Sequence, residues 1–268
     1  MIDVHCHLAD NKFKEDSAEV IRRAVMSGVE KMVVVPEFES QFDKVIAMSG
    51  EHQGIVYAGI GVHPIQKRNK GVQMKHVAKV EQYIAANEED VICIGEVGLD
   101  HTISQFKLSK NDLEVQEQVF NCQIDIAKHF EKPLNVHSRS AARRTIEVLR
   151  NAEVPSDQVV LHAFDGSVED AAFGVEAGYM FSVPPSFTNN DRAAQLIKSI
   201  PIHFLLLETD SPALGPLKNV KNVPENIFIS AEIIATSKGI SPEEVKTITS
   251  ANAHRVFNFH KQRKDRNF

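Results

Sequence analysis

The chain has 268 residues, a formal net charge of −6 at neutral pH, and hydrophobic and charged fractions of 43% and 25%. These totals fit an ordinary globular protein with one large domain, and we predict a single domain over residues 1–268. The acidic balance argues against a protein that coats nucleic acid by bulk charge, because such a surface would be basic.

Strand-like and helix-like periods alternate along the chain. Short apolar runs predict eight strands, at Ile2–His7, Lys31–Pro36, Ile55–Val62, Val91–Glu96, Leu134–His137, Val159–His162, Tyr179–Val183 and Phe204–Glu208. Apolar residues spaced i, i+3, i+4 predict helices between them, such as Ser17–Ser27, Val72–Ala86, Leu113–Phe130, Arg143–Asn151, Val168–Glu176 and Asp191–Ser199. Two more helices are predicted near the C-terminus, at Pro224–Thr236 and Pro242–Phe259.

This alternation indicates parallel strands joined by right-handed crossovers. The strands are nearly continuous apolar runs, which is typical of a sheet covered on both faces. The economical closure is a (β/α)8 barrel of the α/β class with additional C-terminal helices. A doubly wound open sheet is the alternative, but Leu8-Ala9-Asp10 follows the first strand where a dinucleotide fold would have a glycine-rich turn.

The C-terminal region contains two local signals. Ser241 precedes Pro242, and Glu244 follows at the third helical position, so the sequence predicts an N-cap with a capping box. The tail Lys261–Arg266 is mostly basic. We interpret it as a solvated chain end, with a nucleic-acid contact as the alternative.

The cysteine content and the hydropathy indicate the cellular compartment of the protein. The three cysteines include no Cys-x-x-Cys pair and we expect no secretory leader, which favours a reducing compartment, the cytoplasm or the nucleus. Cys6 and Cys93 alternate away from the polar residues that end their strands, so we interpret both as buried apolar side chains. No apolar run approaches the ~18 residues of a membrane span, so we expect no membrane partner.

Two histidines open the chain in the stretch Ile2–Leu8, which reads IDVHCHL. Because a strand alternates faces with period two, His5 and His7 should point to one side and Cys6 to the other. Two neutral imidazoles aimed at one point make half of a transition-metal site. More polar side chains stand at the ends of the later predicted strands, namely His63, Glu96, His137, His162, Glu208 and Asp210.

This set of side chains is larger than one catalytic zinc uses, because such a zinc takes three protein ligands and keeps an open position. It suits two divalent ions ~4 Å apart that share a carboxylate, and Glu96 enters between the two histidine groups as the natural bridge. We predict one ion held by His5, His7, Glu96 and Asp210, and another held by Glu96, His137 and His162. A shared water would become the hydroxide nucleophile, with Asp210 as its general base.

Imidazole ligands favour zinc, manganese, iron or cobalt, with magnesium as an alternative where substrate oxygens complete the shell. His63 can bind a phosphate or protonate the leaving group, or it packs structurally or serves a weak third ion. Glu37 is either a surface-loop residue, a ligand of a third ion, or a group behind the ligands. Glu208 shares a strand face with Asp210 and can orient a ligand or a proton-relay water, so the predicted catalytic residues are Glu96, Asp210, His63 and Glu208.

Substrate contacts are predicted from His63, Arg139 and Ser211. Arg139 can hold a phosphate in a fork, whereas Arg143 and Arg144 are expected to face solvent. Aromatic side chains near the rim can stack a base, but core packing is the expected role for Phe164, Phe181 and Phe187.

Six phrases, in chain order, resemble the signatures of the TatD-type metal-dependent deoxyribonucleases of the amidohydrolase superfamily: DVHCHL, GVHP, GEVGLD, NVHSRSA, LHAFDGS and LLLETDSPAL. The resemblance covers the chain from Ile2 to about Phe257. Single motifs such as GVHP are weak signals, but all six in order are highly specific. The phrases ETDSPALGP and NIFISAEIIA are similar to an animal branch of that family.

The resemblance implies a TIM barrel that hydrolyses phosphodiester bonds in DNA with divalent metal, by exonuclease or abasic-site activity. It carries the metal ligands onto His5, His7, Glu96, His137, His162 and Asp210, and a phosphate contact onto His63. Two departures put rim contacts in doubt. His101-Thr102 follows Asp100 where many members have an aromatic residue and an arginine, and Asn222-Val223-Pro224 stands where many have Asn-Glu-Pro.

Two other classes of function compete with the nuclease. A metal-dependent amidase or lactonase would use the same barrel, but many such relatives place a carboxylated lysine on the fourth strand, where this chain has Glu96. A binding protein without turnover would tolerate loss of ligands, and none is lost. We therefore expect DNA as the partner, two divalent ions (zinc, magnesium or manganese) with an optional third, and no obligate protein partner.

Overall fold

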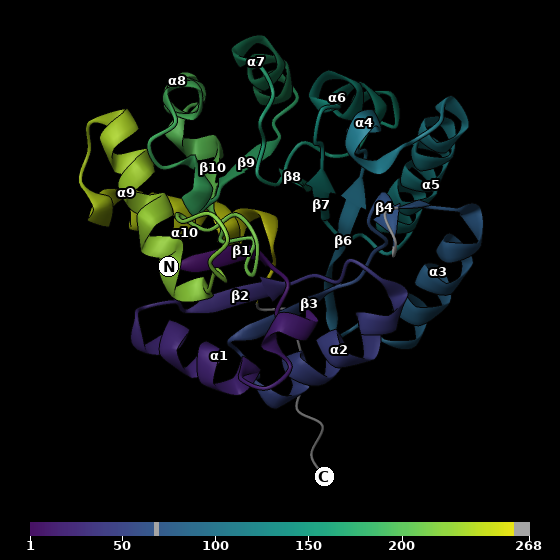
Figure 1. Ribbon diagram of the computed structural model, residues 1–268, viewed down its shortest axis with the longest axis horizontal. Helices are drawn as coiled ribbons and strands as arrows, with labels where there is room; N and C mark the ends of the chain where they lie inside the picture. Colours follow the sequence, from purple (N-terminus) through teal and green to yellow (C-terminus); the bar gives the residue numbers. More distant parts are fainter. Residues whose placement is uncertain (67–69, 260–268) are drawn as a thin grey trace.

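Eight parallel strands form one sheet with the order β1-β2-β3-β6-β7-β8-β9-β10, and helices surround it (Figure 1). The structure is a computed structural model that describes residues 1–66 and 70–259. The strands are β1 (Ile2–Cys6), β2 (Lys31–Val34), β3 (Val56–Gly59), β6 (Val91–Gly98), β7 (Leu134–His137), β8 (Val159–Leu161), β9 (Met180–Val183) and β10 (Leu205–Leu207). All eight predicted strands are therefore confirmed, with slightly different ends.

Backbone hydrogen bonds close this sheet into the predicted barrel. The amide nitrogen of Asp210 donates to the carbonyl oxygen of His5 at 2.9 Å, and that of His7 donates to the carbonyl oxygen of Ser211 at 2.7 Å. Both bonds join the first strand to the last at their carboxyl ends. The predicted (β/α)8 barrel is confirmed, and the doubly wound alternative is wrong, since an open sheet would leave these edges apart.

Helices follow the strands as the alternation predicts. They are α1 (Ser17–Met26), α2 (Phe42–Glu51), α3 (Val77–Ala86), α4 (Ile103–Phe106), α5 (Lys110–His129), α6 (Ala142–Asn151), α7 (Val168–Glu176), α8 (Asp191–Ser199), α9 (Ile227–Lys238) and α10 (Pro242–Val256). Helices α7 and α8 have the predicted ends. The capping box of α10 is confirmed, because the Ser241 hydroxyl accepts from the Glu244 amide and Glu244 accepts from the Ser241 amide.

Three elements were not among the predictions. Helix α2, the single-turn helix α4, and an antiparallel hairpin of β4 (Ile65–Gln66) and β5 (Lys70–Gly71) all lie in the connections of the barrel. The predicted helix at Val72–Ala86 begins later, at Val77, after a 3-10 turn over Met74–His76. The tail Lys261–Arg266 lies outside the described residues, as does His260.

Two hydrophobic clusters form the core, one outside the ring of strands and one inside it. The larger one packs the outward faces of the strands against the helices. The smaller one joins inward residues of the strands, such as Ile2, Val33 and Leu206, to Ala253 and Phe257 at the end of α10. The interior is therefore filled with apolar side chains and closed by α10 at the amino end of the strands, so polar chemistry is confined to the carboxyl end. Within the described ranges, no helix has the length and apolar character needed to cross a bilayer.

The pleat of β1 is irregular just before the histidine motif. Val4 belongs to the interior cluster, Cys6 belongs to the outer one, and the register with β2 shifts between Asp3 and Cys6. The shift lets His5 and His7 share the inner face with Val4. The register of β6 also shifts, and Cys93 belongs to the interior cluster of the barrel. The prediction that Cys93 points away from the side of the ligands is therefore wrong. Both cysteines are buried, as predicted.

Candidate metal centre

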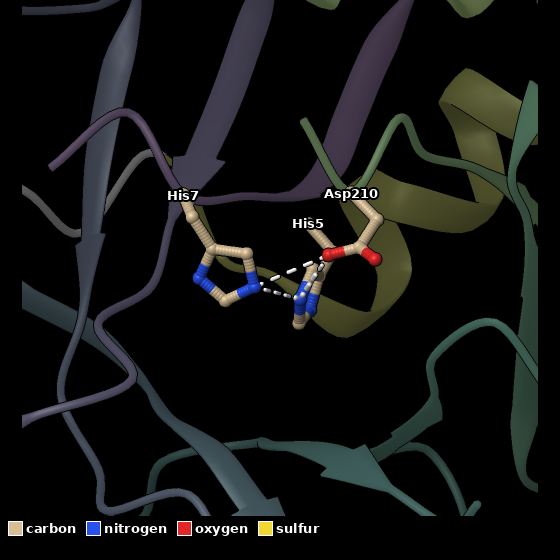
Figure 2. A group of neighbouring side chains, drawn as sticks. All are labelled: His5, His7 and Asp210. Carbon is tan, nitrogen blue, oxygen red and sulfur yellow. Dashed lines mark hydrogen bonds and ion pairs between the residues drawn. The ribbon is translucent and has the colours of Figure 1, made fainter. Parts of the chain in front are cut away.

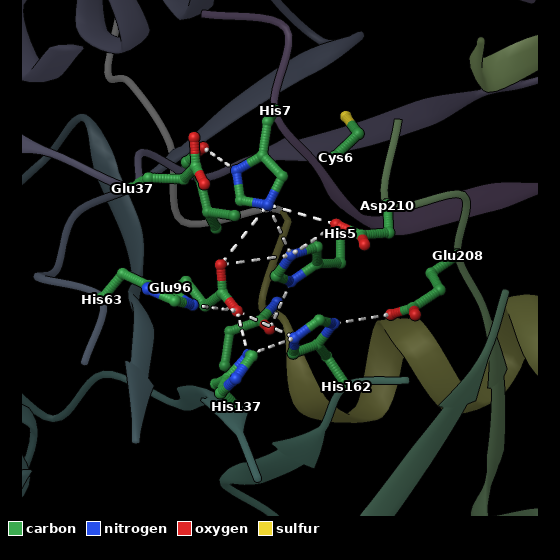
Figure 3. Close-up of polar contacts among 12 residues, drawn as sticks. His5, Cys6, His7, Glu37, His63, Glu96, His137, His162, Glu208 and Asp210 are labelled. Atoms are coloured by element: carbon green, nitrogen blue, oxygen red, sulfur yellow. Dashed lines mark hydrogen bonds and ion pairs between the residues drawn. The ribbon is translucent and has the colours of Figure 1, made fainter. Parts of the chain in front are cut away.

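The six side chains predicted as metal ligands converge at the carboxyl end of the barrel, from five separate strands or the loops that follow them (Figure 3). All six are nearly buried, with at most 6% of each residue exposed. Residues up to 205 positions apart in sequence thus meet at one point, because every parallel strand delivers its carboxyl end to the same rim.

The first group is His5, His7 and Asp210 (Figure 2). The Nε2 atoms of the two imidazoles lie 3.1 Å apart, and Oδ1 of Asp210 lies 3.5 Å from Nε2 of His5 and 3.2 Å from Nε2 of His7. Asp210 has a left-handed backbone with φ 52°, a conformation that aspartate and asparagine tolerate better than most residues. This turn directs the carboxylate back toward the first strand.

Glu96 lies between the two histidine groups (Figure 3). Its Oε2 lies 3.4 Å from Nε2 of His7 and 3.7 Å from Nε2 of His5. Its Oε1 lies 2.7 Å from Nδ1 of His137 and 2.8 Å from Nε2 of His162. One oxygen therefore faces each pair of imidazoles, which is the arrangement that a bridging carboxylate requires.

The spacing of these atoms fits divalent cations. Ligands ~2.1 Å from a common tetrahedral ion are separated from one another by about 3.4 Å. Most separations within the first group, and the 3.3 Å between Nδ1 of His137 and Nε2 of His162, are close to that value. The donor set of imidazole nitrogens and carboxylate oxygens therefore suits a pair of transition-metal ions.

Backbone and amide groups orient the first two imidazoles. Nδ1 of His5 lies 2.8 Å from the side-chain oxygen of Asn135, whose amide nitrogen donates in turn to the carbonyl oxygen of Val4. Nδ1 of His7 lies 3.0 Å from the carbonyl oxygen of Val35. Because both partners are acceptors, each Nδ1 must carry the proton, and each Nε2 keeps its lone pair for a cation.

Carboxylates lie behind the other two imidazoles. Oδ2 of Asp100 lies 3.0 Å from Nε2 of His137, which leaves Nδ1 facing Glu96. Oε2 of Glu208 lies 3.6 Å from Nδ1 of His162 and accepts a hydrogen bond from the Ser182 hydroxyl. The Asp100–His137 hydrogen bond is of the kind that fixes the ring orientation and raises the basicity of a ligating imidazole, whereas Glu208 and His162 are close but beyond hydrogen-bonding distance.

Asp100 and Asn135 were not among the predicted site residues. Asn135 stands two residues before His137 in β7, so the period of two could have placed both on one face. Asp100 follows β6 in the phrase GEVGLD, where its acidic side chain at a strand end was a usable signal. Both are fully buried and reach the centre only through a histidine, so the spacing of direct ligands does not reveal them.

The centre concentrates negative charge in a buried place. Burial raises the pKa of Asp210, but the adjacent imidazoles of His5 and His7 outweigh that effect and hold the pKa well below its usual range. Burial also raises the pKa of Glu96, and the neighbouring imidazoles of His63 and His162 reverse that effect. Two ionised carboxylates therefore face the ring nitrogens, and this field favours cations.

A cavity of about 320 Å³ opens above this centre. His7, Glu96, His137, His162 and Asp210 line its floor, while its walls include Lys12, Glu37, Phe38, His63, Phe106 and Arg139. Nδ1 of His63 contacts the backbone of Ile65, so its Nε2 faces the centre, 3.6 Å from Oε1 of Glu96. Burial lowers the pKa of His63 to about 4, so this ring is neutral at pH 7.

Two predicted site residues lie away from the cavity. Ser211 is fully buried and its hydroxyl lies 2.9 Å from that of Thr209, so this geometry does not support a substrate contact. Glu208 is also fully buried, behind His162, where it can orient a ligand but cannot touch the substrate.

Two arginines and two phenylalanines of the predicted rim have the expected structural roles, whereas Glu37 does not lie in a surface loop away from the site. Arg143 pairs with Asp170, and Arg144 pairs with Glu117, on the outer side of α6. Phe164 and Phe181 are buried against each other with ring centroids 5.1 Å apart. Glu37 lines the cavity, and burial raises the pKa of its carboxyl group.

Glycine makes the close approach of β6 and β7 possible. Gly98 has φ 137°, and a Cβ atom there would lie 2.0 Å from the carbonyl oxygen of His137. A side chain at this position would therefore separate the two strands. Because Glu96 and Asp100 flank Gly98, this contact brings both carboxylates beside the His137 ring.

The structure also shows which residues stand at the two places where the sequence differs from many members of the family, after Asp100 and at Asn222-Val223-Pro224. After Asp100, the short helix α4 places Phe106 in the wall of the cavity, so an aromatic side chain reaches the rim from a later position. Asn222 is buried, and its side-chain nitrogen donates to the carbonyl oxygens of Thr209 and Ala213 at 2.7 and 2.8 Å. Asn222 therefore fixes the loop after β10, although Val223 stands in place of a glutamate.

Comparison with known proteins is consistent with this geometry. The family model described as "TatD related DNase" matches residues 2–258. A human protein named Deoxyribonuclease TATDN3 is 42% identical over 261 residues, which cover 96% of this chain and 94% of that protein. The metal-dependent hydrolase YabD of Bacillus subtilis is 31% identical over 96% of this chain and 98% of its own length. The crystal structure of YJJV, a TATD homolog from Escherichia coli, superposes with a TM-score of 0.86 at 25% identity, over 96% and 98% of the two chains.

Proposed function

This chain belongs to the family of TatD-related DNases, a family of metal-dependent hydrolases, and on that premise we propose that it hydrolyses phosphodiester bonds in DNA. The proposed activity is exonuclease cleavage, cleavage at abasic sites, or both, carried out by one barrel domain. The human relative is named a deoxyribonuclease, and the bacterial relative is named a metal-dependent hydrolase.

The observation that carries this proposal is the position of Glu96, with one carboxylate oxygen toward each pair of imidazoles. We propose that Glu96 bridges two divalent cations, with His5, His7 and Asp210 completing one site and His137 and His162 the other. Bound there, such ions would supply Lewis-acid charge that acidifies a water and neutralises oxygens of the scissile phosphate.

The chain's own residues take three further roles in this proposal. Asp210 accepts the proton that the attacking water releases, because its carboxylate lines the cavity beside the imidazoles of His5 and His7. His63 and Arg139 hold the phosphate, since both line the same cavity beside the centre. Asp100, Asn135 and Glu208 are positioning residues that fix the ligand rings.

The rival assignment is a metal-dependent amidase or lactonase. Barrels of that kind that bridge two metals through a carboxylated lysine need a lysine on β6, and this chain has Glu96 there. A cavity with Arg139 and Lys12 in its wall also suits an anionic substrate better than a neutral amide. Both observations favour the phosphodiesterase.

The proposed function is tested by incubating the purified protein with labelled single-stranded, duplex and abasic-site DNA. We expect cleavage with Mg²⁺, Mn²⁺ or Zn²⁺, loss of cleavage in EDTA, and recovery when metal is restored. A fully metallated protein that leaves all three DNAs intact, but hydrolyses an amide or lactone panel, would establish the rival function instead.

Replacement of His63 separates phosphate binding from metal binding. We expect His63→Ala to lower kcat/KM by roughly 10- to 100-fold, as expected for loss of one group that contacts the transferring phosphate, while the metal content stays unchanged. The measurement is steady-state hydrolysis of DNA beside metal analysis by mass spectrometry. The exposed His129, replaced in a matched His129→Ala variant, serves as the control. Loss of a metal ion from His63→Ala would instead make His63 a ligand.

A further inference from the structure

A second cavity, of about 570 Å³, adjoins the catalytic one. Lys12, Pro212 and Ala213 line both cavities, so the two are continuous at the loop that follows Asp210. This second cavity is lined by the loop after β10, by Lys12 from the segment after β1 and by Ser186 from the segment after β9. We refer to it as the lysine cavity.

The charge of the lysine cavity is opposite to that of the chain as a whole. Its walls include Lys12, Lys218 and Lys221, and no carboxylate is present among its described lining residues. The full chain has a net charge of −6. Positive charge is therefore concentrated on one of the surfaces that adjoin the catalytic cavity, where it attracts a polyanionic substrate.

The loop that carries these lysines is held in shape before any ligand binds. Asn222 donates to the carbonyl oxygens of Thr209 and Ala213, and its own amide donates to the carbonyl oxygen of Pro212 at 3.1 Å. Lys221 ties the loop to the other wall, since its ammonium group lies 2.7 Å from Asp16 and donates to the carbonyl oxygen of Lys12. The cavity is thus braced across both loops.

Lys221 has a structural partner, but the other two lysines do not. Within the described ranges, the ammonium groups of Lys12 and Lys218 form no ion pair with a carboxylate, and both residues are exposed. Two cations on a braced surface with no internal counter-charge are available to an anionic ligand. Leu217 and Val220, with 65% and 57% of their surfaces exposed, lie in the same loop and offer apolar contact between the charges.

We propose that the lysine cavity holds the backbone of the nucleic-acid strand on one side of the scissile phosphate, with Lys12 and Lys218 each facing a phosphate group. This inference rests on the proposed function and adds to it a second substrate-binding site outside the metal centre. A nucleic-acid strand repeats phosphate groups beside nucleobases, which matches two lysines, unpaired in the part of the chain that the structure describes, on opposite walls of one cavity with the exposed Leu217 and Val220 near Lys218. A small phosphodiester bound at the metal centre lies in the catalytic cavity, which Lys218 does not line.

The proposal predicts that Lys218→Ala discriminates against long substrates, because Lys218 lines the lysine cavity but not the catalytic one. Lys12→Ala, at a residue that also lines the catalytic cavity, is added only for the binding measurement. The two substrates are a labelled single-stranded oligonucleotide and bis-p-nitrophenyl phosphate, both assayed with the metallated protein. We expect the ratio of their kcat/KM values to fall by roughly two- to fivefold in Lys218→Ala, because KM for the oligonucleotide rises by the amount that one exposed charge contact is worth. Lys198→Ala is the matched control, since Lys198 lies in the last turn of α8, at the opposite end of the barrel.

Binding provides a second measurement that does not need turnover. A phosphorothioate oligonucleotide that resists hydrolysis is titrated by fluorescence anisotropy across salt concentrations. The slope of log K against log salt should become shallower by about 0.7 for each lysine removed. If the wild-type protein cleaves DNA while the ratio and the KM stay unchanged in Lys218→Ala and the salt slope stays unchanged in both variants, the lysine cavity does not hold the strand and the proposed function stands. If no phosphodiester is cleaved, the proposed function fails, and an unchanged salt slope would overturn this inference as well.

Discussion

Glu96→Gln is expected to lower kcat/KM by at least about 10³-fold, which corresponds to ~4 kcal/mol of lost transition-state stabilisation. Glutamine keeps the shape of the buried side chain, so the barrel should fold normally. Its amide nitrogen cannot ligate a cation, however, and Glu96 has one oxygen facing each pair of imidazoles. Loss of the bridge should therefore weaken binding of both metal ions at once.

The Glu96→Gln experiment needs three readouts from one preparation, namely metal content, thermal unfolding and DNA hydrolysis. Glu232→Gln is the matched control, because Glu232 is exposed on α9 and makes no contact with the centre. We expect the control to keep its metal and its activity. An active Glu96→Gln protein with a full complement of metal would show that Glu96 does not bridge, and the two-ion assignment would have to be abandoned.

Asp210→Asn is expected to cost about 10²- to 10³-fold in kcat, comparable to removal of one preorganised charge-stabilising group. Asparagine tolerates the left-handed backbone that Asp210 adopts, so the loop should remain intact. The variant loses the carboxylate that faces His5 and His7 but keeps Glu96 and the other pair of imidazoles. We therefore expect loss of one bound ion and retention of the other.

The metal stoichiometry distinguishes Asp210→Asn from the bridge variant. Binding isotherms for Mn²⁺ or Zn²⁺ should show one tight site in Asp210→Asn and none in Glu96→Gln. Asp125→Asn, on the exposed face of α5, is the control and should match the wild type. If Asp210→Asn keeps both ions and loses only turnover, Asp210 acts as a proton acceptor without being a ligand.

The layout of the barrel and the candidate ligands could be predicted from local signals. Eight apolar runs alternating with amphipathic stretches are sufficient to predict a parallel barrel. Parallel strands need crossover helices between them, and eight such strand–helix units close into a ring. That rule also predicts that polar residues at the carboxyl ends of strands will meet. His5, His7, Glu96, His137 and Asp210 stand at those ends, so their convergence follows from the topology.

Other features could not be predicted because they depend on contacts between distant segments. Asp100 and Asn135 act only through His137 and His5, and nothing in their own segments shows which ring they will support. The pleat shifts in β1 and β6 arise from register with neighbouring strands, so period-two counting misplaced Cys93. Ser211 has a hydroxyl beside a predicted ligand, yet the loop turns it toward Thr209.

The amino-acid sequence by itself determined the fold class, the donor chemistry and the rim at which the donors gather, since all three follow from residue type and period along single segments. Only the tertiary structure decided that Glu96 turns one oxygen to each pair of imidazoles, that Glu208 lies behind His162, and that Lys12 and Lys218 line one cavity from two loops. These depend on side-chain directions and on packing between strands and loops that no local period encodes, because they are set jointly by residues far apart in the chain.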